Sequence, residues 1–183
     1  DYGNIISCRW GLDSSIMGIF LKDISLRGKT ALITGATKGL GRGAAEAIAE
    51  AGGNIIAIGR NQSELDSLGK KIKKLKVKYT SFNCDVNNYG KIKNFINSLK
   101  KLDVLVNNAG TNIPENFLKV KKTSLETILN VNTKAVFNIA QLCANQIIKL
   151  DRKEGSIINI SSIFGLVAGQ KRTVYSMTKF GVE

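Results

Sequence analysis

The chain has 183 residues, 43% of them hydrophobic and only one of them proline, so it can bury one substantial core and is not disordered by composition. It carries a formal net charge of +13 and contains three cysteines and no histidine. The lack of histidine excludes His-based catalysis and the usual zinc sites, and we expect no metal site. The scattered cysteines cannot all pair, which favours a reducing, cytoplasmic setting.

The positive charge does not by itself indicate a nucleic-acid partner. Much of it lies in residues 70–78, which follow a helical apolar stripe formed by Leu65, Leu68, Ile72 and Leu75. We therefore interpret these lysines as the solvated face of an amphipathic helix. Neither a nucleic-acid motif nor interleaved aromatic residues accompany them, so we expect no nucleic-acid partner; a steep salt dependence of oligonucleotide affinity would favour that alternative.

The N-terminal residues show no targeting pattern. Residues 1–16 lack the basic stretch and apolar core of a signal peptide, and no apolar run approaches the roughly 20 residues that cross a membrane. We expect no membrane association. We also expect residues 1–25 to form a poorly ordered tail and residues 26–183 to form one domain.

Short apolar runs alternate with helical patterns along the rest of the chain. We predict strands near residues 30–33, 54–58, 79–84, 102–106 and 156–160, and helices over 42–50, 62–76 and 89–99. A further helix of about 25 residues is predicted to begin with a capping box formed by Thr123 and Glu126. This alternation predicts an α/β fold: a doubly wound parallel sheet with helices on both faces and ligands at the carboxyl ends of its strands.

The first strand leads into a glycine-rich turn, Thr34-Gly35-Ala36-Thr37-Lys38-Gly39-Leu40-Gly41, and then into a helix. Glycine permits a tight turn and close approach of a phosphate, and the free N–H groups of the helix start supply donors. Polar or glycine residues also follow the other four strands, at Arg60, Asp85, 107–110 and 161–162. Because all five clusters fall at one edge of the predicted sheet, they indicate a nucleotide site there.

Arg60 bears on which nucleotide would bind. It ends the second strand, 19 residues after Gly41, and no carboxylate stands beside it in the sequence. In dinucleotide-binding folds an acidic residue here bonds the ribose 2′-OH, whereas arginine accommodates a 2′-phosphate. Lys38 adds a second cation, so we predict NADP(H) in preference to NAD(H). The alternative is an ordinary surface arginine.

Taken together and in order, these motifs resemble the short-chain dehydrogenase/reductase family over residues 26–183. The matching residues are the glycine-rich turn, Asp85, Asn107-Asn108-Ala109-Gly110, Asn132, Ser162 and Tyr175-Ser176-Met177-Thr178-Lys179. A second Tyr-x-x-x-Lys pattern, Tyr89 to Lys93, is interpreted as an ordinary part of a crossover helix. The resemblance implies a Rossmann-type fold without its last strands, since the chain ends four residues after Lys179. We therefore expect a C-terminally truncated piece whose fifth strand forms an uncovered edge.

The resemblance implies a catalytic set of Asn132, Ser162, Tyr175 and Lys179. Tyr175 would donate or accept the proton, and Lys179, one helical turn away, would favour the phenolate and bind the nicotinamide ribose. Ser162 would donate a hydrogen bond to the substrate oxygen, and Asn132 would hold a water that links Lys179 to solvent. Without the resemblance, Asn132 could be a tolerated polar residue of a helix and Ser162 a loop hydroxyl that caps nearby backbone.

The resemblance also assigns cofactor contacts, to Gly35, Thr37, Lys38, Gly39, Leu40, Gly41, Arg60, Asn61, Asp85, Val86, Asn108, Ala109, Gly110, Tyr175 and Lys179. It implies an NADP(H)-dependent oxidoreductase that acts on a small-molecule carbonyl or alcohol, similar to 3-oxoacyl-carrier-protein reductases and to sugar-acid or polyol dehydrogenases. When full length, we expect it to be a homodimer or homotetramer. The alternatives are a non-catalytic nucleotide-binding protein of the same fold and an inactive fragment.

Overall fold

The computed structural model describes residues 25–151 and 154–183, so the predicted tail lies outside the described residues except for Ser25. One five-stranded sheet has the order β3-β2-β1-β4-β5, and all four pairings are parallel. Its strands are β1 (Thr30–Thr34), β2 (Asn54–Gly59), β3 (Tyr79–Asn83), β4 (Val104–Asn107) and β5 (Ser156–Asn159). The predicted parallel α/β fold is therefore confirmed.

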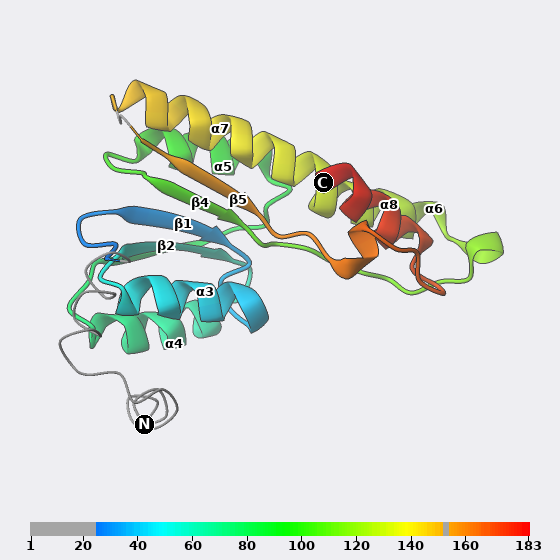
Figure 1. The fold of residues 1–183 in the computed structure, drawn as a ribbon, viewed down its shortest axis with the longest axis horizontal. Coiled ribbons are helices and arrows are strands. Elements are labelled where there is room, and N and C mark those ends of the chain that lie inside the picture. The colour runs from blue at the N-terminus through cyan, green and yellow to red at the C-terminus, as the bar shows by residue number, and fades with distance from the viewer. Residues whose placement is uncertain (1–24, 152–153) are drawn as a thin grey trace, which may run out of the picture.

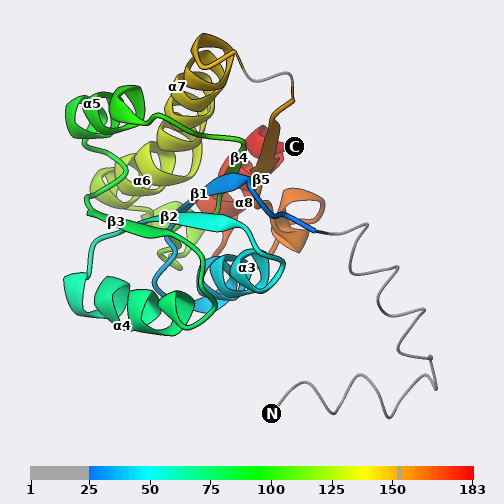
Figure 2. The same cartoon turned by 90° about the vertical axis from the view of Figure 1, so that its left-hand side faces the viewer.

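Helices cover both faces of the sheet (Figure 1). One face is covered by α3 (Gly39–Glu50) and α4 (Gln62–Lys73), and the other by α5 (Tyr89–Ser98) and α7 (Ala135–Lys149). Figure 2 shows these two layers with the sheet between them. Two more helices, α6 (Lys122–Leu129) and α8 (Thr173–Val182), lie beyond the carboxyl ends of the strands.

Successive side chains of a strand point to opposite faces of the sheet. Because helices cover both faces, the side chains of the inner strands are buried on both sides. In β1, Leu32 joins the core beneath α5 and α7, whereas its neighbours Ala31 and Ile33 join the core beneath α3 and α4. The edge strand β5 differs, since all four of its residues are exposed, Ile157 and Ile158 among them. The predicted exposure of the fifth strand is thus confirmed.

The predicted capping box at the start of the long helix is wrong. The helix begins at Lys122. Lys121 occupies the N-cap position, and its side chain makes no capping hydrogen bond. Glu115, from the preceding loop, accepts a hydrogen bond from the backbone N–H of Lys121 at 3.2 Å, and Thr123 lies inside the helix, where its carbonyl accepts from the hydroxyl of Thr127. The carboxylate that bonds a backbone N–H at this helix start therefore comes from the preceding loop and not from Glu126 inside the helix.

The same helical run is interrupted by a π-helical turn, Asn130–Lys134, between α6 and α7. Such turns are rare and are found disproportionately at functional sites. This one carries Asn132, a residue that the sequence already indicated as catalytic, and buries it completely. The carbonyl of Val136, just beyond the turn, accepts a hydrogen bond from the Asn107 side chain at 3.1 Å. The end of β4 is thereby bonded to the start of α7.

Replacing Leu105 by alanine should test the core beneath α5 and α7. Leu105 is fully buried in β4, so the Leu105→Ala variant should lose about 2–5 kcal/mol in the free energy of unfolding, measured by urea titration. Leu118 is 87% exposed, and Leu118→Ala should change this free energy by less than about 0.5 kcal/mol. Equal losses in both variants would contradict the described core.

Candidate functional site

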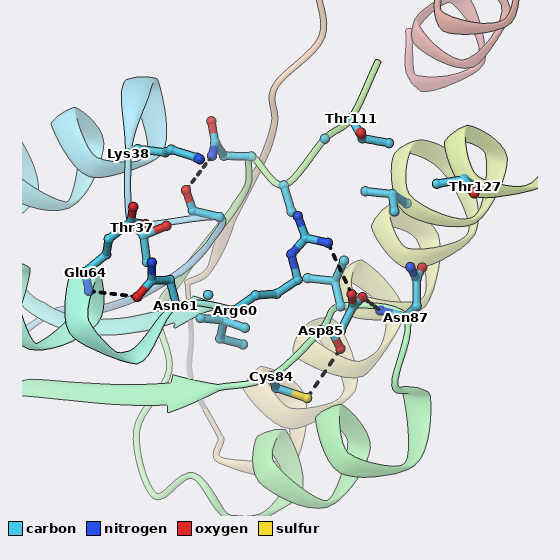
Figure 3. A pocket seen from close by; sticks show the side chains of 18 residues that line it. Thr37, Lys38, Arg60, Asn61, Glu64, Cys84, Asp85, Asn87, Thr111 and Thr127 are labelled. Carbon is cyan, nitrogen blue, oxygen red and sulfur yellow. Dashed lines mark hydrogen bonds and ion pairs between the residues drawn. The ribbon is translucent and has the colours of Figure 1, made fainter. Parts of the chain in front are cut away.

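A pocket of about 440 Å³ opens at the carboxyl ends of β1, β2, β3 and β4 (Figure 3). Ten of the fifteen predicted cofactor contacts line it: Gly35, Thr37, Lys38, Arg60, Asn61, Asp85, Val86, Asn108, Ala109 and Gly110. The other five do not: Gly39, Leu40, Gly41, Tyr175 and Lys179. The ends of β1, β2, β3 and β4 therefore meet at one site, as the motif positions predicted.

The pocket also contains residues that the sequence analysis missed: Ile58, Gly59, Glu64, Cys84, Asn87, Thr111, Thr127 and Val131. Cys84, Asn87 and Thr111 lie next to or within two residues of predicted contacts, so their position in the sequence could have indicated them. Thr127 and Val131 come from α6 and the π-helical turn. No local signal marks these two, because tertiary packing brings their helix to the pocket.

The glycine-rich turn has a tight backbone and leads into a helix start without a side-chain cap. Gly35 and Gly39 have φ values of +63° and +57°, which residues with side chains rarely adopt. Helix α3 begins without a side-chain cap and has no acidic residue in its first turn. A Cβ on Gly41 would overlap the Gly35 carbonyl and the Asn108 amide. The turn is therefore closed tightly, with the start of α3 suited to a phosphate.

Asn108 bonds the glycine-rich turn to the end of β4. Its side-chain amide donates to the carbonyls of Thr34 and Gly35, at 3.1 Å each. In return, the Thr34 hydroxyl accepts from the backbone N–H groups of Asn108 and Ala109, at 3.0 Å each. Asn108 thus lines the pocket and also fixes the position of the turn.

Arg60 has a carboxylate partner that its sequence neighbourhood does not show. Its Nη1 lies 3.6 Å from Oδ2 of Asp85, which follows the neighbouring strand β3 (Figure 3). The Arg60 side chain is 78% exposed and that of Asp85 is 42% exposed. Such a solvent-exposed pair is worth less than about 1 kcal/mol, so it can open readily for a competing anion.

Asn132 joins three segments near one end of the pocket. Its Oδ1 accepts from the Thr111 backbone N–H at 2.8 Å, and its Nδ2 donates to the Thr111 carbonyl at 2.9 Å. The same Nδ2 donates to the hydroxyl of Thr178 in α8 at 3.1 Å. A buried asparagine with these partners fixes the loop after β4 against α8, so it is more than a tolerated polar residue.

Lys179 is buried beside Asn132 and Tyr175. Its Nζ donates to the Ile160 carbonyl at 2.6 Å and lies 5.8 Å from the centre of the Tyr175 ring. A Cβ built on Gly110 would lie 3.6 Å from Asn132 Oδ1 and 3.8 Å from Lys179 Nζ. Gly110 lines the pocket, so Asn132 and Lys179 adjoin its Gly110 end. Burial lowers the pKa of Lys179 below its ordinary value of 10.5.

Ser162 lies in a turn that packs against α8. Its Oγ accepts from the Phe164 backbone N–H at 3.2 Å, so it does cap nearby backbone, and its O–H remains free to donate elsewhere. The Phe164 ring meets the Tyr175 ring edge-on, with 6.3 Å between centres. A Cβ on Gly165 would lie 3.0 Å from the Lys179 carbonyl oxygen. The turn with Ser162 is thereby placed beside Tyr175 and Lys179.

The second Tyr-x-x-x-Lys pattern lies at the exposed start of α5. There the Lys93 Nζ lies 6.0 Å from the centre of the Tyr89 ring, and neither residue lines the pocket.

Within residues 25–151 and 154–183, no helix is long and apolar enough to cross a membrane. The same residues hold no cluster of three or more acidic or cysteine side chains that could bind a metal.

The pH dependence of stability should report the burial of Lys179. Because its pKa is lower in the folded protein than in the unfolded chain, the unfolded state binds more protons at pH values between the lowered pKa and 10.5, and this contribution makes stability rise with pH across that window. We expect the free energy of unfolding of Lys179→Met, measured by urea titration between about pH 8 and 10, to rise less with pH than that of the unsubstituted protein. The exposed Lys122→Met should keep the original slope. Identical slopes in all three proteins would contradict this assignment.

Comparison with known proteins agrees with this geometry. The family model described as short chain dehydrogenase matches residues 29–183. The 3-oxoacyl-[acyl-carrier-protein] reductase FabG of Thermotoga maritima is 34% identical, the match covering 86% of this chain and 65% of that protein. The L-xylulose reductase of Mesocricetus auratus is 33% identical, with 88% and 64% covered. The chain thus spans a little under two thirds of the length of these relatives.

A solved structure has the same arrangement of elements. It is from Agrobacterium tumefaciens, is provisionally described as a 2-deoxy-d-gluconate 3-dehydrogenase and contains bound NADP. It is 28% identical, with a TM-score of 0.80 over 87% of this chain and 63% of that one. From the family match and the two relatives above 30% identity, we conclude that the chain belongs to the short-chain dehydrogenase family.

Proposed function

We propose that this protein is an NADP(H)-dependent oxidoreductase that interconverts a carbonyl and an alcohol, with residues 26–183 forming its nucleotide-binding domain. One observation carries the proposal. The pocket is lined both by the glycine-rich turn and by Gly110 and Thr111, and these two residues adjoin Lys179 and Asn132. A nucleotide bound along the pocket would therefore have one end beside the catalytic set.

The residues of the pocket fit a dinucleotide phosphate. Gly35 and Gly39 have a left-handed backbone conformation, and the start of α3 has no side-chain cap; both features suit a pyrophosphate. Lys38 and Arg60, both in the pocket lining, supply cations for a 2′-phosphate, and Asn61 follows Arg60 at the start of α4. These cations support NADP(H) over NAD(H). Gly39, Leu40 and Gly41 complete the first turn of α3, where they would support the phosphates.

A bound NADPH would supply the hydride for the substrate carbonyl carbon. Tyr175 would donate its phenolic proton to the carbonyl oxygen, forming the alcohol, and would accept that proton in the reverse reaction. Lys179, held by the Ile160 carbonyl, would stabilise the resulting phenolate. Ser162 would donate its free O–H to the substrate oxygen as negative charge develops there. Asn132 would act by fixing Thr111 and α8, and by holding a water that connects Lys179 to solvent.

The substrate class follows from the relatives. One of them is a reductase of 3-oxoacyl-carrier-protein and the other reduces L-xylulose, so we propose a 3-oxoacyl thioester or a sugar or polyol as substrate. Both chemistries present a carbonyl next to polar groups. We propose a homodimer or homotetramer for the whole protein, and its cytoplasmic location stays a prediction.

Replacing Tyr175 by phenylalanine tests the proposed reaction. In the whole protein, Tyr175→Phe should lower the turnover number for NADPH-dependent reduction by a factor of about 10² or more, because no proton donor remains. It should leave the dissociation constant of NADPH, measured by calorimetry, within about twofold. Tyr89→Phe, in the exposed Tyr-x-x-x-Lys pattern, is the matched control and should retain full turnover. A 3-oxoacyl thioester and a ketose serve as the two test substrates.

Retained turnover in Tyr175→Phe would exclude this residue as the proton donor. Binding of NADPH without reduction of any carbonyl by the unsubstituted protein would instead indicate a non-catalytic nucleotide-binding protein. Absence of NADPH and NADH binding would contradict the proposed function as a whole.

Two glycines of α3 offer a matched test of the phosphate turn. Gly41→Ala places a Cβ against the Gly35 carbonyl and should weaken NADPH binding by more than about tenfold, because the turn has to shift. Gly43→Ala, two residues along the same helix, has open space around its Cβ and should retain binding. Alanine there should also stabilise the helix by up to about 1 kcal/mol. Calorimetric titration with NADPH measures the first effect, and equal affinities in the two variants would contradict it.

A further inference from the structure

We propose that Asp85 is a specificity-determining residue, which limits the preference for NADPH over NADH by pairing with Arg60. The inference rests on the proposed function, since it assumes that the pocket takes a dinucleotide with its 2′-phosphate near Arg60. It assigns to Asp85 a role opposed to that of Arg60, through the ion pair between these two lining residues of the pocket (Figure 3).

The sheet places the two residues together. Gly59 and Asn83 are partners in the parallel pairing of β2 and β3, so Arg60 and Asp85 leave neighbouring strands at the same edge. Both line the pocket, with Arg60 Nη1 3.6 Å from Asp85 Oδ2. The contact therefore follows from strand register, and the long arginine side chain only has to reach sideways by one strand.

The carboxylate is the more firmly held partner. Asp85 Oδ1 accepts a hydrogen bond from the Asn87 backbone N–H at 2.8 Å, which fixes the carboxylate to its own turn. The Arg60 side chain is 78% exposed and is anchored through its ion pair with Asp85. On binding a 2′-phosphate with two parallel hydrogen bonds, Arg60 would exchange its contact with Asp85 for the phosphate. Part of the phosphate's binding free energy is then spent on breaking the pair.

The charges around the pocket reinforce this competition. Its lining contains two cations, Lys38 and Arg60, and two carboxylates, Glu64 and Asp85. A 2′-phosphate adds further negative charge to this balanced set, whereas NADH adds none at that position. Any contact of Asp85 with the adenine ring is common to both cofactors. The ratio of their dissociation constants therefore isolates the effect of Asp85 on the phosphate.

Asp85→Asn should therefore raise the ratio of the NADH to the NADPH dissociation constant by about threefold to fivefold, as expected for an exposed charge pair. The measurement is calorimetric titration of the whole protein with NADPH and with NADH. Arg60→Ala should lower the same ratio. In the Arg60→Ala background, adding Asp85→Asn should change the ratio by less than about twofold, because Asp85 acts through Arg60.

Two further variants complete the experiment. Asp66→Asn makes the same change in net charge on the exposed surface of α4, where Asp66 bonds Gln62 outside the pocket, and should leave the ratio unchanged. Asp85→Ser supplies a hydroxyl that can accept the hydrogen bond from the Asn87 backbone N–H. It should show the same rise in the ratio if the asparagine variant fails to fold. A ratio that stays constant or falls in the folded Asp85 variants overturns the inference, as does an equal rise without Arg60. If the unsubstituted protein binds neither cofactor, the proposed function fails as well.

Discussion

The reciprocal hydrogen bonds between Thr34, Gly35 and Asn108 are the interaction on which the rest of the site depends. They join the end of β1 to the end of β4, at the edge of the sheet where both strands end. Because the glycine-rich turn is bonded to Asn108, its position is fixed relative to Gly110 and Thr111, two and three residues further along. The glycine-rich turn and the loop after β4 are thus parts of one hydrogen-bonded unit.

That unit continues through Asn132. This side chain uses its carbonyl oxygen and both amide hydrogens on Thr111 and Thr178, so it connects the loop after β4 to α8. An asparagine inside a regular helix tends to compete with the backbone for hydrogen bonds. Asn132 lies instead in a π-helical turn, where the backbone departs from the regular α-helical hydrogen-bond pattern. The same turn is followed by Val136, whose carbonyl is bonded by Asn107. Asn132 therefore bonds the π-helical turn to its surroundings, and Asn107 bonds the start of α7 that follows it.

Much of the fold could be predicted because its signals are local. Apolar runs, helical stripes and the glycine-rich turn each occupy a few consecutive residues, and the carboxyl-end rule then brings four of the five clusters to one pocket. What could not be predicted depends on contacts between distant residues. Thr127 and Val131 reach the pocket only through the packing of α6, and Asp85 meets Arg60 only because β2 and β3 are neighbours. The capping box failed for a local reason: the helix begins at Lys122, before Thr123, and the carboxylate that bonds the Lys121 N–H belongs to Glu115 in the preceding loop.

The end of β2 shows how the fold separates its framework from its selectivity. A Cβ on Gly59 would lie 2.6 Å from the methyl group of Thr37 and 3.5 Å from Leu65, so residue 59 has no room for a side chain. Variation at this strand end is thereby confined to Arg60 and Asn61, both exposed to solvent. Under the proposed function, a descendant of this protein could exchange one nicotinamide cofactor for the other by changing these surface positions, while every buried residue of the sheet stayed as it is.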